Sequence, residues 1–242
     1  MVKYMGSKAR HAKEILPIIL ADRQPGQWYV EPFVGGANVI DKVDGNRIGA
    51  DYNPWVACLW QAVADGWVPP DVVTEGKYDE ARGARNVDAL TAFIGFGCSY
   101  SGKWFGGYAR GDDAKGNPRN YCAESKRNIL KQAASLQGVK FHHSSYDNLA
   151  IPDQSIIYCD PPYAGTTGYA TGAFDHGKFW QWCRDGVRDG HKVFVSEYTA
   201  PDDWVSVWEK RVNNTLTKDT GSKKGIERLF VLRGHEPKMG LF

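Results

Sequence analysis

The sequence predicts an α/β fold: a Rossmann-like sheet with helices on both faces and an inserted, mainly helical segment. Two observations predict it. Apolar runs typical of strands alternate with runs of helical periodicity over residues 1–64, and the alternation resumes over residues 139–242. Residues 65–138 instead contain two helical patterns and a glycine-dense loop. We therefore expect one domain formed by residues 1–64 and 139–242, with residues 65–138 inserted into it.

The first part of the chain supplies the elements that begin the sheet. We expect a helix from Ser7 to Ile15 that ends near Pro17, because proline disfavours a helix interior. Proline is favourable in the first turn, so Pro54 indicates a helix start. The elements expected after the first helix are a strand at Trp28–Phe33, a short helix at Asn38–Val43, a strand at Arg47–Asp51 and a helix at Pro54–Ala64.

The inserted segment and the C-terminal part follow. The insertion has predicted helices at Asp79–Phe93 and Tyr121–Leu136, with the glycine-dense loop Gly95–Gly111 between them. The alternation then continues with strands at Val139–His143 and Ser155–Asp160, a helix at Phe174–Asp189, and strands at Lys192–Tyr198 and Ile226–Leu232.

Composition narrows the class of protein. The formal net charge of the 242 residues is only +2, so a nucleic-acid surface would be a local patch. None of the five cysteines forms a C-x-x-C pair and none pairs with histidine at zinc spacing, so we expect no metal site. The chain lacks both an apolar run of about 18 residues and the pattern of a signal peptide. We expect a soluble, cytoplasmic protein without membrane contacts.

The strongest chemical signal is Asp160-Pro161-Pro162-Tyr163, directly after an apolar strand. Strand C-termini are where ligands bind in open α/β sheets. Two prolines make a rigid turn without backbone donors, so its carbonyls face outward as acceptors. Asp160 adds a carboxylate and Tyr163 a flat ring. The alternative is an ordinary turn, but the position at a strand end favours a site for a planar base with an exocyclic amine.

That arrangement meets a chemical need. The amine of adenine is a poor nucleophile, because its lone pair is delocalised into the ring. If Asp160 and the Pro161 carbonyl each accept one amine hydrogen, the nitrogen can become pyramidal and its developing positive charge is stabilised. Stacking on Tyr163 holds the base, and the rest of the catalysis is positioning. We expect Asp160, Pro161, Pro162 and Tyr163 to be catalytic.

Two further segments indicate a nucleoside cofactor. Glu31-Pro-Phe-Val-Gly-Gly36 places glycines after the first strand, where a ligand can approach the backbone closely. The pattern is not G-x-G-x-x-G, which disfavours a dinucleotide. Asp51 ends the second strand, where an acid commonly binds ribose hydroxyls. Asp51 could instead cap the helix that begins near Pro54, but Asn53 is an equally good cap.

Taken together, these motifs resemble the Dam-like DNA adenine N6-methyltransferases. Six spaced segments carry the resemblance, in the family's order and over most of the chain: Lys3–Lys8, Glu31–Gly36, Gly49–Asn53, Ser144–Asp147 with Ser155–Tyr163, Val193–Glu197 and Lys223–Phe230. Ala37 departs from the family, many of whose members have a third glycine there. The loop Gly95–Gly111 lacks the Arg-x-x-Phe-Asn motif of bacterial relatives and resembles that of phage-type members.

The resemblance implies a function and a set of binding residues. It implies methyl transfer from S-adenosylmethionine to the N6 amine of adenine in duplex DNA, by base flipping. The implied cofactor-binding residues are Tyr4, Gly6, Lys8, Glu31, Phe33, Gly35, Gly36, Asp51, Asn53, Asp147 and Asp160. Residues 1–64 and 139–242 would then bind the cofactor and catalyse the reaction.

The family places DNA recognition in the inserted segment, residues 65–138. Its glycine-rich loop mixes charge and aromatic rings at Lys103, Trp104, Tyr108 and Arg110, which suits contact with phosphates and base edges. The alternative is that the aromatic side chains pack inward. Lys223 and Lys224 form a second candidate DNA contact, and Tyr169 is a candidate for closing the base pocket.

Other readings remain open at this point. The methylated amine could belong to N4 of cytosine, to RNA adenine or to a protein glutamine, although Asp160 at the first position favours adenine. A catalytically inactive DNA-binding relative is a second class, which the intact Lys8, Asp51 and Asp160 argue against. A nicotinamide-dependent oxidoreductase is a third, which the missing G-x-G-x-x-G argues against.

Overall fold

A computed structural model describes residues 8–112, 115–163, 174–213 and 224–238 of the chain. Its strands form a seven-stranded sheet in the order β3-β2-β1-β4-β5-β7-β6. The strands are β1 (Tyr29–Glu31), β2 (Arg47–Asp51), β3 (Lys140–His143), β4 (Ile156–Cys159), β5 (Lys192–Glu197), β6 (Trp204–Asn213) and β7 (Lys224–Leu232). β7 runs antiparallel to β5 and β6, whereas β1 pairs in parallel with β4, β2 with β3, and β4 with β5. The predicted α/β class is confirmed.

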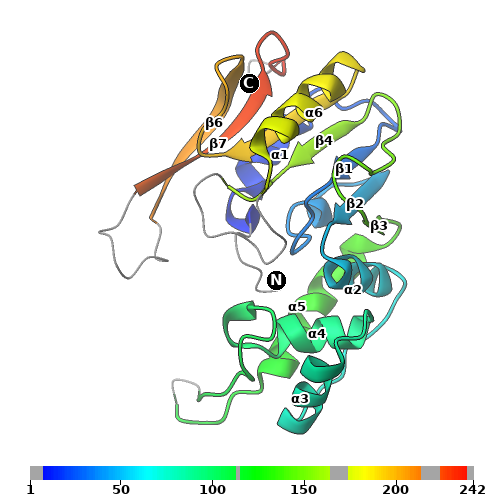
Figure 1. Ribbon diagram of the computed structural model, residues 1–242, viewed down its shortest axis with the longest axis vertical. Coiled ribbons are helices and arrows are strands. Elements are labelled where there is room, and N and C mark those ends of the chain that lie inside the picture. The colour runs from blue at the N-terminus through cyan, green and yellow to red at the C-terminus, as the bar shows by residue number, and fades with distance from the viewer. Residues whose placement is uncertain (1–7, 113–114, 164–173, 214–223, 239–242) are drawn as a thin grey trace. The chain divides into compact units, whose positions relative to one another are not determined.

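Helices and strands alternate in the first part of the chain and again around the fourth and fifth strands, whereas several helices follow one another between the second and third strands (Figure 1). The helices are α1 (Ala12–Ile19), α2 (Pro54–Ala64), α3 (Glu75–Ala84), α4 (Ala89–Gly97), α5 (Tyr121–Leu136) and α6 (His176–Arg188), with 3-10 turns η1 (Lys8–Arg10), η2 (Ile40–Lys42) and η3 (Tyr100–Gly102). Every helix in the described part of the chain is too short or too polar to cross a membrane.

The chain forms two compact units, which divide the sequence differently from the predicted insertion. The first consists of residues 1–12 and 34–149, and the second of residues 13–33 and 150–242. The predicted insertion, residues 65–138, lies within the first unit and supplies α3, α4 and α5. The assignment of this insertion as a separate recognition segment stays a prediction.

In the first unit, α2 connects the two parallel strands to the inserted helices. It packs against β2 and β3, and also against α4 and α5. The helix begins where predicted because Asn53 accepts a hydrogen bond from the Trp55 N–H and Pro54 occupies the first helical position. Its buried face carries Val56, Leu59 and Trp60, which are at most 3% exposed.

The predicted helix at Asp79–Phe93 is wrong, because two helices occupy this stretch. Arg85 ends α3 with φ +49°, in the left-handed region that terminates helices. Asp88 then starts α4, its carboxylate accepting a hydrogen bond from the Thr91 N–H. α4 also continues to Gly97, so the first three residues of the predicted glycine loop are helical.

The second unit packs α6 against its part of the sheet. The buried residues of α6 lie on one face of the helix: the adjacent Phe179 and Trp180, then Cys183 and, four residues later, Val187. α6 lies along β5, as Figure 1 shows. The long antiparallel pair β6 and β7 completes this unit. The sequence prediction missed β6 and started β7 at Ile226 rather than Lys224.

The predicted end of the first helix near Pro17 is also wrong, since α1 continues through Pro17 to Ile19. Pro17 is the sixth residue of α1, so its missing N–H removes one hydrogen bond in the C-terminal half of this short helix. The apolar side chains around it are buried at Ile15, Leu16, Ile18 and Ile19. Burial of that face offsets the lost hydrogen bond.

Candidate active site

The tetrapeptide Asp160–Tyr163 lies where the sequence predicted, directly after β4. All four residues of β4 are buried, and the strand pairs in parallel with β5 through Cys159 and Val195. Pro161 is buried, whereas Asp160, Pro162 and Tyr163 are half-buried. The turn is therefore anchored in the core by its strand and by one proline, while its polar groups lie nearer the surface.

A side chain of β7 and one just after β5 hold the ring of Tyr163. Its hydroxyl donates a hydrogen bond of 2.7 Å to Oε2 of Glu227, on β7. Its ring meets the ring of Tyr198 edge-on, with centroids 4.6 Å apart and an interplanar angle of 83°. Tyr198 directly follows β5. The aromatic group that the sequence assigned to base stacking is thus fixed by two contacts.

Electrostatics keep the phenols of this region neutral. Burial, and then the negative charges of Asp160 and Glu227, raise the pKa of the Tyr163 hydroxyl well above its ordinary value. Burial and the charge of Asp160 likewise raise the pKa of Tyr158, whose hydroxyl lies 2.9 Å from Oγ of Ser196. Both phenols therefore remain hydrogen-bond donors at neutral pH.

The glycines of the predicted cofactor loop, Gly35 and Gly36, lie in the first unit, and three side chains bind the backbone of residues 35–37. The Gly35 N–H donates to Oδ2 of Asp51 over 3.0 Å. The Gly35 carbonyl accepts a 2.7 Å bond from Nε1 of Trp60, on α2. Gln132, on α5, lies within 3.4 Å of the Gly36 carbonyl and 3.2 Å of the Ala37 carbonyl through its Nε2. Hydrogen bonds to these side chains thus hold the Gly35 N–H and the carbonyl groups of the loop in place.

Backbone conformation explains why glycine is favoured here. Gly35 has φ +46°, and Ala37 has φ +50°. Both values lie in the left-handed region, which costs a residue with a Cβ about 1–2 kcal/mol. The departure from the family at Ala37 therefore places an alanine in a conformation that suits glycine.

Asp51 ends β2 with its carboxylate facing backbone donors. Its Oδ1 accepts a 2.9 Å hydrogen bond from the Asn53 N–H, in addition to the Gly35 bond on Oδ2. Asn53, and not Asp51, caps α2. Burial raises the pKa of Asp51 from its ordinary 3.8 to about 6, although the two N–H groups oppose that shift. Each carboxylate oxygen can accept a second bond, so Asp51 retains capacity for hydroxyl donors.

Two other predicted cofactor residues have structural roles in the second unit. Glu31 is 3% exposed and accepts a 2.8 Å hydrogen bond from the Tyr29 hydroxyl. The ring of Phe33 packs edge-on against Phe174 and against Phe179 of α6, with centroids 5.9 and 5.7 Å away. These contacts order the end of β1. Cofactor contact by Glu31 and Phe33 stays a prediction.

The remaining predicted residues are placed less fully. Lys8 is buried in η1, and Asp147 is exposed in a turn after β3. Tyr4, Gly6, Tyr169 and Lys223 lie outside the described residues, and only the backbone of Lys224, in β7, is described. Among the described residues, no group of three or more His, Cys, Asp or Glu side chains could hold a metal ion.

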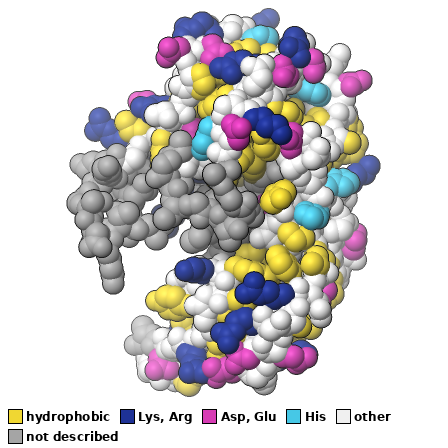
Figure 2. Space-filling model, viewed as in Figure 1, with side chains coloured by type: hydrophobic (Ala, Val, Ile, Leu, Met, Phe, Trp, Pro, Cys, Tyr) yellow, Lys and Arg dark blue, Asp and Glu magenta, His cyan; other side chains and the backbone are white. Residues whose placement is uncertain are grey.

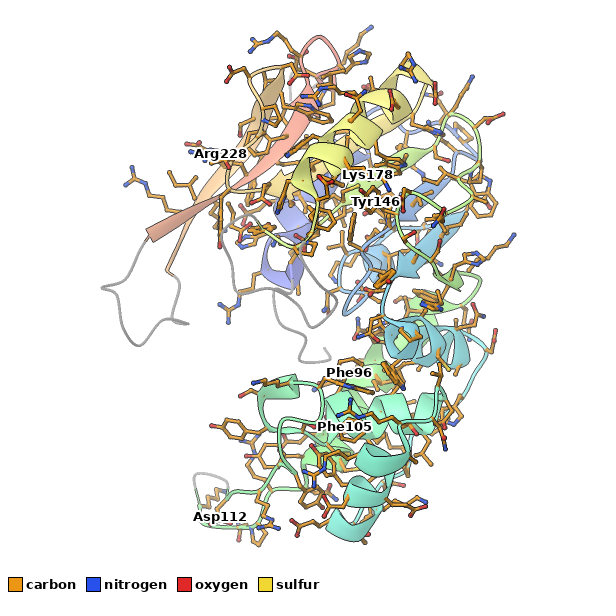
Figure 3. All side chains as sticks on the ribbon, in the orientation of Figure 1. Phe96, Phe105, Asp112, Tyr146, Lys178 and Arg228 are labelled. Atoms are coloured by element: carbon orange, nitrogen blue, oxygen red, sulfur yellow. The ribbon has the colours of Figure 1, made fainter. Side chains whose placement is uncertain are left out.

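The candidate DNA loop packs its aromatic rings inward. Trp104 lies 4.6 Å from both Phe96 and Phe105 and 4.7 Å from Trp55, between ring centroids. Figure 3 labels Phe96 and Phe105 at this aromatic cluster. The Tyr108 hydroxyl donates to the Val73 carbonyl over 2.7 Å. This is the inward-packing alternative that the sequence left open, and the rings hold the loop in place.

Charged groups on that loop differ in their partners. Arg110 forms an ion pair with Glu75 at the start of α3. Lys103 is exposed. Figure 2 shows Lys and Arg interspersed with Asp and Glu over the helices of the first unit, and not one continuous basic field. A DNA contact by Lys103, Trp104, Tyr108 or Arg110 stays a prediction.

Sequence reasoning missed the residues that hold the site from a distance. Trp60 and Gln132 bind the glycine loop from helices 25 and 96 positions away along the chain. Glu227 binds Tyr163 from 64 positions away. Glu227 stands inside the Lys223–Phe230 segment, so that block was a signal for it. Nothing in one sequence links Trp60 or Gln132 to the loop.

Comparison with known proteins gives a family. The family model described as D12 class N6 adenine-specific DNA methyltransferase matches residues 4–88 and 100–216. No curated protein matches the chain. Among solved structures, the chain is similar to the rRNA methyltransferase aviRa from Streptomyces viridochromogenes, with a TM-score of 0.42 and 11% identity over 93% of this chain and 84% of that chain.

Proposed function

The chain belongs to the D12 class of N6 adenine-specific DNA methyltransferases, and we propose that its tetrapeptide Asp160–Tyr163 binds the adenine amine that is methylated. The reaction is methyl transfer to the N6 amine of adenine in DNA, and the resemblance inferred from the sequence is confirmed. Which residues perform each part of it is our proposal. The observation that carries it is a turn at the end of a buried parallel strand, in which Pro161 and Pro162 have no N–H.

Asp160 and Pro161 each accept a hydrogen bond from one N–H of the amine. The Asp160 carboxylate and the Pro161 carbonyl are acceptors, and neither Pro161 nor Pro162 has an N–H that could compete. Their two bonds localise the lone pair on nitrogen and stabilise its positive charge as the new bond forms. Asp160 is half-buried after β4, so its negative charge acts where water screens it less.

Tyr163 supplies the stacking surface for the base. Adenine N6 cannot be reached inside a duplex, so the base must leave the stack at a cost of a few kcal/mol. The ring of Tyr163, held by Glu227 and Tyr198, offers a fixed platform that offsets part of this cost. Duplex DNA and base flipping are thus parts of the proposal.

The loop Gly35–Ala37 and Asp51 fit the nucleoside cofactor that methyltransferases use in general. S-adenosylmethionine supplies a methyl group on a positively charged sulfur. Gly35 and Gly36 present bare backbone on which a ligand can rest. Asp51 has spare acceptor capacity for ribose hydroxyls, beside the two backbone bonds that orient it. Lys8, Glu31, Phe33, Asn53 and Asp147 are further candidates.

The inserted residues 65–138 are proposed to recognise DNA. Lys103 is exposed on a loop whose neighbouring rings are anchored, so its charge is presented from a fixed backbone. Such a lysine contacts phosphate and gives affinity without sequence preference. Arg110, paired with Glu75, would have to exchange that partner for phosphate.

The identity of the methylated nucleoside tests the proposal. The wild-type protein is incubated with radiolabelled S-adenosylmethionine and unmethylated duplex DNA of mixed sequence, and the DNA is digested to nucleosides. We expect the label in N6-methyladenine. Label in N4-methylcytosine would contradict the adenine assignment. No label in DNA, with cofactor still bound, would favour an RNA or protein substrate or an inactive DNA-binding relative.

A further inference from the structure

Tyr163 depends on a residue far from the tetrapeptide. Its hydroxyl donates to Glu227, whose side chain on β7 is 9% exposed. Burial makes this bond strong, because water cannot replace either partner at little cost. The raised pKa of Tyr163 keeps the hydroxyl protonated, so it remains a donor. The Tyr163 ring is thereby tied at its outer end to the sheet.

Tyr198, which directly follows β5, constrains the same ring, and hydrogen bonds fix its own N–H and carbonyl. The Tyr198 N–H donates to Oε1 of Glu197 over 2.8 Å. The Tyr198 carbonyl accepts a 2.5 Å bond from Nη1 of Arg228, which is labelled in Figure 3. Glu197 and Arg228 are cross-strand partners of β5 and β7. Tyr198 and Glu227 each lie one residue beyond that pair, which is why both reach Tyr163.

These contacts matter because the prolines fix only the backbone of the turn. A tyrosine side chain has two rotatable bonds, and a base can stack on it only if both are set. The bond to Glu227 and the edge contact with Tyr198 act at different places on the ring and set both. A ring ordered before the base arrives does not lose that freedom on binding.

We propose that Glu227 is a positioning residue for methyl transfer: through the Tyr163 hydroxyl it orients the ring on which the target adenine stacks. This inference rests on the proposed role of the tetrapeptide. Glu227 itself does not touch the reacting amine. Its contribution therefore depends on the hydroxyl of Tyr163.

A double-mutant cycle tests this dependence. Glu227→Leu, Glu227→Gln, Tyr163→Phe and Glu227→Leu with Tyr163→Phe are compared in single-turnover methylation of DNA, each at saturating S-adenosylmethionine. Glu227→Leu and Tyr163→Phe should each slow methylation by roughly 10-fold, because either one breaks the same bond. The double variant should be no slower than the single variants, since no bond remains to lose. Glu227→Gln, which keeps an acceptor oxygen, should recover most of the rate.

Glu209 provides the matched control. It is a glutamate of the neighbouring strand β6, exposed and paired with Arg228 at 3.4 Å. Glu209→Leu makes the same change of charge and shape and should leave the rate within about twofold of wild type. Circular dichroism and cofactor titration establish that each variant is folded and binds S-adenosylmethionine as the wild type does.

The outcomes separate the inference from the function on which it rests. Losses that multiply in the double variant, or a Glu227→Leu enzyme with the wild-type rate, would overturn the positioning role and leave the proposed function intact. If Glu227→Leu does not fold, the pair Glu227→Gln and Tyr163→Phe decides: a Gln variant as slow as the Phe variant contradicts the role of the acceptor. A wild type that forms no N6-methyladenine overturns both.

Discussion

Two glycine-containing loops of the first unit are held by different kinds of contact. The loop Gly35–Ala37 is fixed by polar side chains, with its N–H and carbonyl groups bonded to Asp51, Trp60 and Gln132. The loop that follows Gly97 packs mainly around rings, above all Trp104, with hydrogen bonds that involve the Tyr78 and Tyr108 hydroxyls. The glycines in both sequences allow a flexible backbone, yet side-chain contacts hold each loop in place.

The difference corresponds to what each loop is proposed to do. A loop that binds a nucleoside must present backbone groups in fixed directions, and hydrogen bonds set direction. A loop that carries a DNA-contacting lysine needs only a stable base, which ring packing provides together with the bonds of the Tyr78 and Tyr108 hydroxyls. Substitutions in the loop Gly35–Ala37 should therefore lower the affinity for the cofactor, whereas substitutions against the rings of the second loop should lower the stability of the protein.

The largest expected effect is on stability, at Gly95. A Cβ added there would lie 2.3 Å from the Trp104 ring and 2.9 Å from the Phe105 ring. Neither ring can move freely, because both belong to the aromatic cluster. Gly95→Ala should lower the free energy of unfolding by about 1–3 kcal/mol, measured by urea denaturation.

Gly76→Ala is its control. Gly76 also lies in a helix, α3, but nothing lies within 4 Å of an added Cβ. Because alanine is the better helix former, this variant should gain about 0.5–1 kcal/mol. Equal effects at Gly76 and Gly95 would mean that the rings do not fix the second loop.

At Asp51 the expected effect is on the cofactor. Asp51→Asn replaces one acceptor oxygen with an NH2 group, which would face the Gly35 or the Asn53 N–H. The loop loses a bond and the ribose loses a charged acceptor. Affinity for S-adenosylmethionine should fall about 10- to 100-fold in calorimetric titration. Unchanged affinity would remove Asp51 from the cofactor site.

Protonation of Asp51 should weaken cofactor binding, as the Asp51→Asn substitution does. Burial places the pKa of this carboxyl at about 6, and only the ionised form offers all its acceptor sites. Affinity for the cofactor should therefore be constant above pH 6 and weaken by up to about tenfold per pH unit below it. Titrations from pH 5 to 8 should show this slope for the wild type, and the Asn variant should lack it.

Protonation of Asp51 should stabilise the fold, although it weakens cofactor binding. Its pKa in the folded state is raised above the ordinary 3.8, so the folded protein binds the proton more tightly than the unfolded chain does. The contribution of Asp51 to stability is greatest below pH 4 and is lost as the pH rises to 6. The fold is thus less stable when Asp51 is ionised, which is the form that suits the cofactor.

The smallest expected effect is at Lys103. Lys103→Ala should weaken DNA binding only a few-fold at moderate salt and reduce the slope of log affinity against log salt by about one. Lys77→Ala, an exposed lysine of α3 that pairs with Glu80, serves as the control and should change neither quantity. A salt slope identical to that of the wild type would place Lys103 outside the DNA interface.

The sequence predicted local features well, because local chemistry determines them. Pro54 and Asn53 start α2 where expected, and α5 spans the predicted residues Tyr121–Leu136. The end of α3 at Arg85 escaped prediction, since no glycine marks that left-handed residue. β6 was missed although Trp204–Asn213 pairs with β7 along its whole length.

For the site, motifs located the groups but not their supports. Asp51 and Asp160–Tyr163 lie at strand ends, as the alternation of elements predicted. Trp60, Gln132 and Glu227 hold those groups through contacts between residues distant in sequence. Only the folded chain reveals such pairs. The inward packing of Trp104 likewise depends on Trp55 and Phe96, which belong to other elements.

The most direct test of the whole account is the methylation rate of Asp160→Ala at saturating S-adenosylmethionine, with Asp153→Ala as control. Asp153 is an exposed acid in the turn before β4. If Asp160 accepts an amine hydrogen, its removal should slow formation of N6-methyladenine by roughly 100-fold or more, while the Asp153 variant keeps the wild-type rate. A folded Asp160→Ala protein that methylates adenine as fast as the wild type would contradict the proposed active site.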